Sequence, residues 1–356
     1  MAGSGAPPTP TPPTIIGQIN AIATAFTQSI QTSSQATALQ EIAQDRPTGG
    51  NNNPPTDNNG QPPPIDNNPR PSTTLTGYVG GLDVVNLNPN RPITGTAAIN
   101  LDAANNRVQG NLDIYAYDPA NPFTQLAHSI HALLQFGSTG STGPANSGYS
   151  DYNNFYANIP DNSTVNNKAV TGVLVSANGV AANQVVTRAI PNLTACQCDY
   201  TRWGFWAVSA ANGNATPDEA LIGTWVAGRP VGSVSDVPTT GTATYTGHVV
   251  ANVNSAGFVA GGFSNAVDFG RRTGAVSVTN LDSTNYSGIV NFNTDPRNFG
   301  GTIDSTNINS DGRTMALQGS FFQGPNSPVG EMGGSVAISS TKDNYLGSGI
   351  FAASRR

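Results

Sequence analysis

The chain has 356 residues, of which 10% are charged and 37% are hydrophobic, and its formal net charge is −6. Cytosolic enzymes typically carry about 25% charged residues, so a chain whose polarity comes from Asn, Thr, Ser and Gln is typical of proteins outside the cell. The acidic balance and the near absence of lysine exclude the basic surface on which nucleic-acid binding depends. The length allows two domains of ordinary size.

The amino-terminal part divides into three segments by composition. Residues 1–14 are rich in Pro and Thr, which predicts an extended tether without a core. Residues 15–45 carry apolar side chains at three- and four-residue spacing, which predicts an amphipathic helix with an almost uncharged polar face. Residues 46–72 contain almost no apolar side chain and are rich in Pro and Asn. They cannot offset the entropy of ordering by burial, so we predict a linker.

The predicted helix at residues 15–45 has two interpretations. It packs on the protein's own sheet, or it packs against another subunit. In the second case the assembly residues are Ile19, Ile22 and Phe26. An uncharged polar face disfavours a helix that lies on anionic lipid, because such helices carry Lys and Arg.

The start of the chain bears on localisation. No stretch reaches the ~20 continuous apolar residues that a membrane-spanning helix needs, and the first residues lack the charged and apolar parts of a signal peptide. The Pro-rich beginning resembles the tether that follows the acylated cysteine of a bacterial lipoprotein, with Met1 where that cysteine would stand. We therefore expect a lipid anchor in the native form.

We predict a first antiparallel β domain over residues 73–237. Residues 93–101 and 108–115 read as two strands joined by an Asn-rich turn, which is a hairpin. We expect a short helix at 123–136, a long Gly/Ser/Asn/Tyr-rich loop at 137–167, and a hinge at 230–238. All three tryptophans of the chain, Trp203, Trp206 and Trp225, fall in this region. We expect them to form the core of the domain.

A second β domain is predicted over residues 238–356. About eight short strand patterns follow one another, cut by Gly, Asn or Asp. Eight strands is the number at which a closed barrel is just filled by its own side chains, and glycines within the strands suit its tight coiling. The expected fold is thus mainly β, with two antiparallel domains of which the second is a small barrel.

The last third of the chain carries a family pattern. It reads Gly-x-Phe-x-x-Gly-Pro, then Glu-x-Gly-Gly, then Gly-x-Phe-x-Ala; its residues are Gly319, Phe321, Gly324, Pro325, Glu331, Gly333, Gly334, Gly349, Phe351 and Ala353. This order resembles the transferrin-binding protein B-like β-barrel of bacterial surface lipoproteins. The resemblance implies an eight-stranded barrel at the extracellular or outer-membrane surface, preceded by a handle-like β domain. It also implies a ligand that is a protein or haem, and no ligand residue is carried over.

Cys196 and Cys198 are the only cysteines, and they lie outside the family pattern. On a strand their side chains would point to one face. We favour a disulfide, because the composition indicates an oxidising compartment. The alternatives are a half-site for zinc or copper, which needs two further ligands, and reduced buried thiols.

Two histidines and one aromatic loop are the other candidate sites. His128 and His131 share a face if residues 123–136 are helical, so they could ligate haem or a metal ion. The alternative places them as polar positions on a helix whose leucines face the core. The loop residues Tyr149, Tyr152, Phe155 and Tyr156 alternate with Asn and Ser, a composition that suits protein recognition. The alternative there is a loop that covers a sheet edge.

Two functions follow from the sequence. The first is a surface-displayed or secreted binding protein without catalysis, because no nucleophile elbow, phosphate loop or pair of neighbouring carboxylates is present. Its ligand would be a protein, with no required cofactor and with haem as the alternative ligand. The second is a self-assembling extracellular subunit of a filament or surface layer, since low charge and few lysines ease association between copies.

Overall fold

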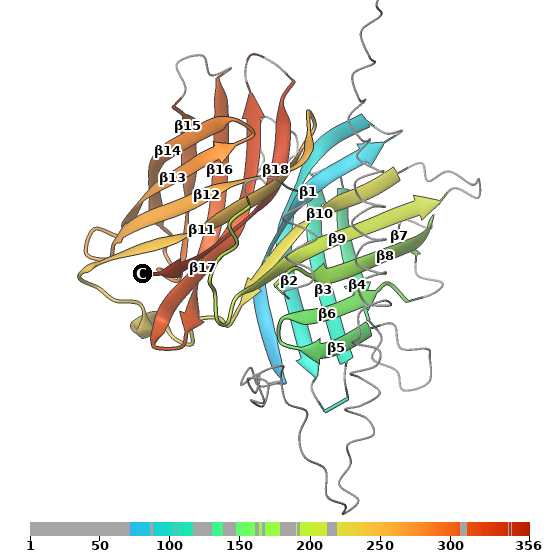
Figure 1. Cartoon of the computed structure of the whole chain (residues 1–356), viewed down its shortest axis with the longest axis horizontal. Helices are drawn as coiled ribbons and strands as arrows, with labels where there is room; N and C mark the ends of the chain where they lie inside the picture. Colours follow the sequence, from blue (N-terminus) through green and yellow to red (C-terminus); the bar gives the residue numbers. More distant parts are fainter. Residues whose placement is uncertain are drawn as a thin grey trace, which may run out of the picture.

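The computed structural model of this protein describes two bodies, a large antiparallel sheet and a closed barrel (Figure 1). The residues described are 72–85, 88–102, 104–105, 107–116, 130–137, 147–160, 164–165, 168–178, 190, 193–211, 219–306, 312–340, 342 and 344–356. A search of these residues finds no helix long and apolar enough to cross a membrane. The predicted tether, the amphipathic helix and all of the linker except residue 72 lie outside them, as do Ile19, Ile22 and Phe26.

The sheet is built from ten strands in the order β4-β3-β2-β1-β10-β9-β8-β6-β5, with β7 paired to β8. Their bounds are β1 Thr73–Val85, β2 Asn88–Asp102, β3 Arg107–Ala116, β4 Ile130–Phe136, β5 Ser147–Asp151, β6 Asn154–Asn158, β7 Thr164–Val165, β8 Lys168–Ser176, β9 Arg202–Ala211 and β10 Glu219–Gly228. The predicted hairpin is confirmed as β2 and β3, which pair from Ile93↔Ala116 to Asp102↔Arg107.

The sheet curls so that its two ends approach each other. The backbone N–H of Gly137, just after β4, donates to the carbonyl of Asn158 at the end of β6 over 2.7 Å. Strand β3 shows strict alternation of buried and partly exposed residues, as expected when only one face of a strand meets a core. The enclosed core contains Trp206 and Trp225 together with aliphatic residues from β1, β2 and β3.

The barrel closes on itself in chain order, because β11 pairs with both β12 and β18. Its strands are β11 Thr242–Val253, β12 Gly257–Asp268, β13 Thr273–Leu281, β14 Thr284–Phe292, β15 Asn298–Ser305, β16 Arg313–Gly324, β17 Ser327–Ser340 and β18 Leu346–Arg355. The predicted eight-stranded antiparallel barrel is therefore confirmed. Asp282 and Ser283, between β13 and β14, both have positive φ angles, the backbone that tight hairpin turns require.

The two bodies pack against each other over a buried apolar interface. Strands β1, β2 and β10 of the sheet contact β11, β17 and β18 of the barrel, as Figure 1 shows. The interface core includes Leu82, Phe205 and Val226 from the sheet side and Val250 and Ile350 from the barrel. The backbones approach so closely that a Cβ atom on Gly80 would overlap the backbone of Gly349.

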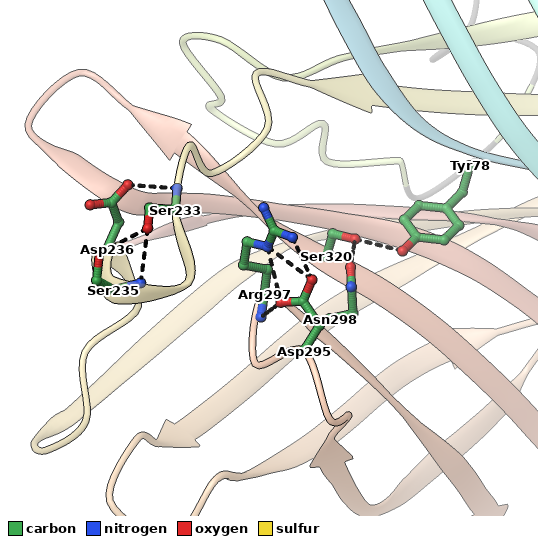
Figure 2. A network of polar contacts seen from close by, with 8 residues as sticks. All are labelled: Tyr78, Ser233, Ser235, Asp236, Asp295, Arg297, Asn298 and Ser320. Atoms are coloured by element: carbon green, nitrogen blue, oxygen red, sulfur yellow. Dashed lines mark hydrogen bonds and ion pairs between the residues drawn. The ribbon is translucent and has the colours of Figure 1, made fainter.

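Polar contacts also cross this interface. The Tyr78 hydroxyl and the Ser320 hydroxyl lie 2.5 Å apart, and Ser320 donates to the Asn298 side chain over 2.6 Å (Figure 2). The Ser348 hydroxyl of the barrel donates to the carbonyl of Ile93 in the sheet over 2.6 Å. Burial raises the pKa of Tyr78 above its ordinary value, so its hydroxyl remains a donor at physiological pH.

The connection between the bodies is packed and does not form the predicted hinge. Val231 and Val237 are buried in the barrel core, and Pro230 forms a β-bridge with Phe322. Between them, Ser233 caps a short 3-10 turn at Val234–Asp236, where its hydroxyl and the Asp236 carboxylate bond to each other's backbone amides (Figure 2). The segment is ordered because two valines anchor it in an apolar core.

Two further expectations need correction. Residues 130–136 form strand β4 and no helix, and the side chains of β4 alternate, with Leu133 59% exposed. Helical and strand periodicity are hard to tell apart in a short apolar run. Here the hydrogen-bonded pairing with β3 stabilises the strand. Trp203 is buried as predicted but lies in the interface between the bodies, apart from Trp206 and Trp225.

Candidate functional site

The segment of residues 193–201 runs along the seam between sheet and barrel, immediately before β9. It forms no strand, so the prediction that Cys196 and Cys198 lie on a strand is wrong. Leu193 is buried in the interface core, and Ala195, Cys196 and Cys198 pack against it. We call residues 193–201 the seam segment.

A buried carboxylate of the barrel holds the carboxyl half of the seam segment. Glu331 of β17 is 1% exposed. Its oxygens accept hydrogen bonds from the backbone N–H groups of Asp199 (2.6 Å), Tyr200 (3.1 Å) and Thr201 (2.6 Å). A buried charge is stable only when its hydrogen-bonding capacity is used. Glu331 is one of only three glutamates in the chain and belongs to the family pattern, but the sequence did not reveal this role.

A buried histidine holds the amino half of the seam segment. The Nδ1 atom of His248, on β11, accepts a hydrogen bond from the Cys196 backbone N–H over 2.8 Å. The imidazole packs on the Trp203 indole with 4.6 Å between ring centroids. Full burial lowers the pKa of His248 to about 3, because an imidazolium would lose its hydration there. His248 is therefore a neutral acceptor at physiological pH.

The cysteines add a covalent constraint between these two anchors. Cys196 and Cys198 form a disulfide across one intervening residue, and neither thiol is free. Neither the metal half-site nor the reduced pair is what the structure contains. The disulfide closes the seam segment into a small loop between the His248 contact and the Glu331 contact.

Two arginines brace the seam segment from the sheet side. The Arg202 guanidinium donates to the carbonyls of Cys198 (3.2 Å) and Tyr152 (2.8 Å) and lies 3.9 Å from the centroid of the Tyr152 ring. Arg229 lies 4.0 Å from the centroid of the Tyr200 ring. The Tyr152 hydroxyl donates to the Tyr200 carbonyl over 2.6 Å. The segment is thus held by side chains of both bodies.

An open groove of about 660 Å³ lies between the seam segment and one end of the barrel. Its lining includes residues 194–197 and 199 of the seam segment. The barrel contributes the β16–β17 turn and the end of β18, where Arg355 and Arg356 lie. Both arginines are exposed, and neither takes part in an ion pair with another described residue. The groove is the candidate functional site, and the sequence analysis did not identify it.

Two of the four residues of the predicted aromatic loop are buried. Tyr152 and Phe155 are 1% and 5% exposed, and the Phe155 ring lies 5.7 Å from that of Trp225. Tyr156 is partly buried against the interface core, and Tyr149 lies on β5. These residues form the β5–β6 hairpin at the edge of the sheet, so the expectation of a recognition loop is corrected for Tyr152 and Phe155.

The predicted histidine pair is not brought together within the described residues. His128 lies outside them, and His131 is on strand β4, where the helical spacing argument does not apply. His131 stacks on Tyr115 with 4.5 Å between centroids, and its Nε2 atom lies 2.8 Å from an Asp113 oxygen. No group of three or more His, Cys, Asp or Glu side chains in the part of the chain that the structure describes is placed to hold a metal ion.

Comparison with known proteins gives likeness in structure only. No known family model matches the chain, and no curated protein matches it. A mutant of the vaccine antigen transferrin binding protein B from Haemophilus parasuis is 12% identical, with 80% of this chain and 77% of that chain covered and a TM-score of 0.34. Isotype 1 transferrin binding protein B from serogroup B Neisseria meningitidis is 12% identical, with 81% of this chain and 77% of that chain covered and a TM-score of 0.32.

The N-lobe domain of lactoferrin binding protein B from Moraxella bovis is also similar. It is 11% identical, with 52% of this chain and 88% of that chain covered and a TM-score of 0.28. These structures belong to the group of proteins that the motif in the last third of the chain resembles. At such identities and TM-scores the likeness concerns the general arrangement of strands, and no residue role is carried across.

Proposed function

We propose that this chain is a non-catalytic binding protein, displayed on the outer surface of a bacterium, whose ligand is another protein. The observation that carries the proposal is the groove of about 660 Å³ beside the seam segment. Its walls come from both bodies and are held in place by buried contacts from Glu331, His248 and Arg202. A pre-organised open groove on a rigid scaffold is suited to recognition, because little ordering entropy is lost on binding.

The family pattern supports the same class of function. Its residues lie on β16, β17 and β18, with Pro325 in the β16–β17 turn, and its glutamate is the one that fixes the seam segment beside the groove. The Pro- and Thr-rich composition of residues 1–14, which predicts an extended tether, supports surface display. Haem stands as the alternative ligand.

The alternative function, a self-assembling extracellular subunit, rests on one surface. The outward side chains of β13, β14 and β15 are almost uncharged, with Asp304 as the exception in these strands, and Ile289 at their centre is 56% exposed. Such a face offers little repulsion to a second copy. This observation concerns association between copies and does not use the groove.

Surface binding of the purified full-length chain tests the proposal. The chain is immobilised and exposed in turn to transferrin, lactoferrin and fractionated serum proteins, while haem is titrated separately by absorption spectroscopy. We expect saturable binding of a protein by a chain that is monomeric in light scattering. Absence of binding to every fraction, or regular polymers under electron microscopy, would reject the proposal, and polymers would favour the subunit.

A further inference from the structure

The seam segment contains unused backbone groups in residues that line the groove. Thr194, Ala195 and Gln197 line it. Among the described residues, their backbone N–H and C=O groups have no hydrogen-bond partner. Thr194 and Gln197 are exposed. The segment therefore offers the kind of unpaired edge to which an extended chain adds by main-chain hydrogen bonds.

The unused groups are held in place before any ligand arrives. The His248 contact fixes Cys196, the disulfide fixes the residues on either side of Gln197, and Glu331 fixes Asp199 to Thr201. An unpaired edge that is already rigid costs little further entropy when a strand pairs with it. This is the difference between the seam segment and an ordinary exposed loop.

The charges of the groove restrict what the added chain can be. Arg355 and Arg356 line the same groove as the seam segment and have no ion-pair partner among the described residues. The Glu331 carboxylate also borders the groove, but three backbone amides occupy it. Asp199 is exposed on the same lining. A segment with one acidic side chain among uncharged ones fits two cations and one anion better than a uniformly acidic segment does.

Building on the proposed function, we infer that the groove binds an extended segment of the partner protein. The segment pairs with the backbone of Thr194, Ala195 and Gln197 and directs an acidic side chain to Arg355 and Arg356. The ligand class is an unfolded or edge segment of a protein, and the mode is strand addition. The seam segment is then the recognition element, in place of the buried aromatic hairpin at Tyr152 and Phe155.

The test uses the full-length chain and a phage library of random dodecapeptides, so it does not depend on knowing the partner. We expect selected peptides to carry an acidic residue and to protect residues 193–199 from amide hydrogen exchange. Methylation of alternate peptide nitrogens should abolish binding, because strand addition needs those N–H groups. The double variant Arg355→Gln/Arg356→Gln should weaken binding about tenfold, since exposed charge pairs contribute modest energies.

The matched control is Arg271→Gln/Arg272→Gln. These arginines are exposed at the β12–β13 turn, which lies at the same end of the barrel but outside the groove. The control also removes two positive charges. Weaker binding in the Arg355/Arg356 variant alone would therefore reflect contacts in the groove and not the change in net charge. Equal weakening by both double variants would overturn the assignment of the groove.

The remaining outcomes separate this inference from the proposed function. If a protein partner binds the chain but residues 193–199 gain no protection, the groove inference fails and the proposed function stands. If the partner binds and the library yields no peptide that competes with it, recognition of an extended segment is rejected. If neither partner nor peptide binds, both ideas fail together.

Discussion

The barrel and the ten-stranded sheet solve the problem of unpaired strand edges in different ways. In the barrel every strand has two hydrogen-bonded neighbours, so no edge is left. The sheet ends at β4 and β5 and is drawn round on itself, with a backbone bond from Gly137 to Asn158. The barrel therefore needs no other part of the chain to pair its strands. The sheet, in contrast, buries part of its surface against the barrel.

This difference places the candidate site. The barrel presents β11, β17 and β18 as a rigid surface, and the less regular body lays its seam segment across that surface. Residues of the seam segment whose backbone groups have no partner among the described residues then line the groove. Four changes test whether the sheet depends on the barrel more than the barrel depends on the sheet.

The largest effect is expected from Gly80→Val. Any side chain at Gly80 would overlap the backbone of Gly349, which is fixed in the barrel by pairing with Ala251. We expect docking of the bodies to weaken by more than about 3 kcal/mol, because neither backbone can move away. Thermal unfolding should then show a separate early transition of the sheet with the barrel transition unchanged. The control Gly232→Ala meets only a side-chain oxygen at 3.4 Å. A single unshifted transition would contradict the prediction.

Removal of the buried carboxylate should have the next largest effect. Glu331→Ala leaves the amides of Asp199, Tyr200 and Thr201 without their acceptor. We expect a loss of about 3 kcal/mol in the free energy of unfolding, measured from denaturant midpoints. Proteolysis should now begin in the seam segment, whereas Asp304→Asn, at an exposed position of β15, should leave the pattern unchanged. Wild-type stability of the Glu331 variant would show that these bonds contribute nothing net.

Acidification should loosen the seam through His248. Its pKa is about 3 in the folded chain and about 6.5 when unfolded. The unfolded state therefore binds the proton first, so stability is full above pH 6.5 and falls as the pH drops towards 3. Between pH 7 and pH 5 we expect a loss of about 2 kcal/mol attributable to this group. His248→Gln should flatten the pH profile in that range. An unchanged slope in the His248 variant would refute the assignment.

The smallest effect concerns the polar contact in Figure 2. Tyr78→Phe removes the hydroxyl that meets Ser320 across the interface, while Ser320 keeps its bond to Asn298. We expect a loss of about 1 kcal/mol, the usual net contribution of one hydrogen bond, confined to the sheet transition. Tyr115→Phe removes a hydroxyl whose acceptor Asp113 lies within the sheet, so it serves as the control. If the barrel transition shifted more than the sheet transition, the barrel would depend on this contact more than the sheet does, contrary to the prediction.

Local patterns were enough to predict most of the barrel and part of the sheet. Each barrel strand is a short run of alternating apolar residues bounded by a turn, and each strand pairs with its neighbour in the sequence. The alternation and the turn residues are therefore enough to predict the strands and their order. Prediction failed at residues 130–136, where a short apolar run fits helix and strand alike. It failed again at the aromatic hairpin, since Tyr and Phe beside Asn look the same in a displayed loop and in a buried edge.

Fold class, strand pattern and family resemblance could be predicted from the amino-acid sequence, because these depend on spacing along the chain. The sequence also drew attention to Glu331, as part of the family pattern, and to the two cysteines, without connecting them to each other or to His248. That these residues meet follows from the folded chain alone, since Cys196 and His248 are 52 positions apart and Thr201 and Glu331 are 130 positions apart. The groove exists only where barrel and sheet dock. Docking depends on how well two folded surfaces fit together, and the periodicity of apolar residues along the sequence does not indicate that fit.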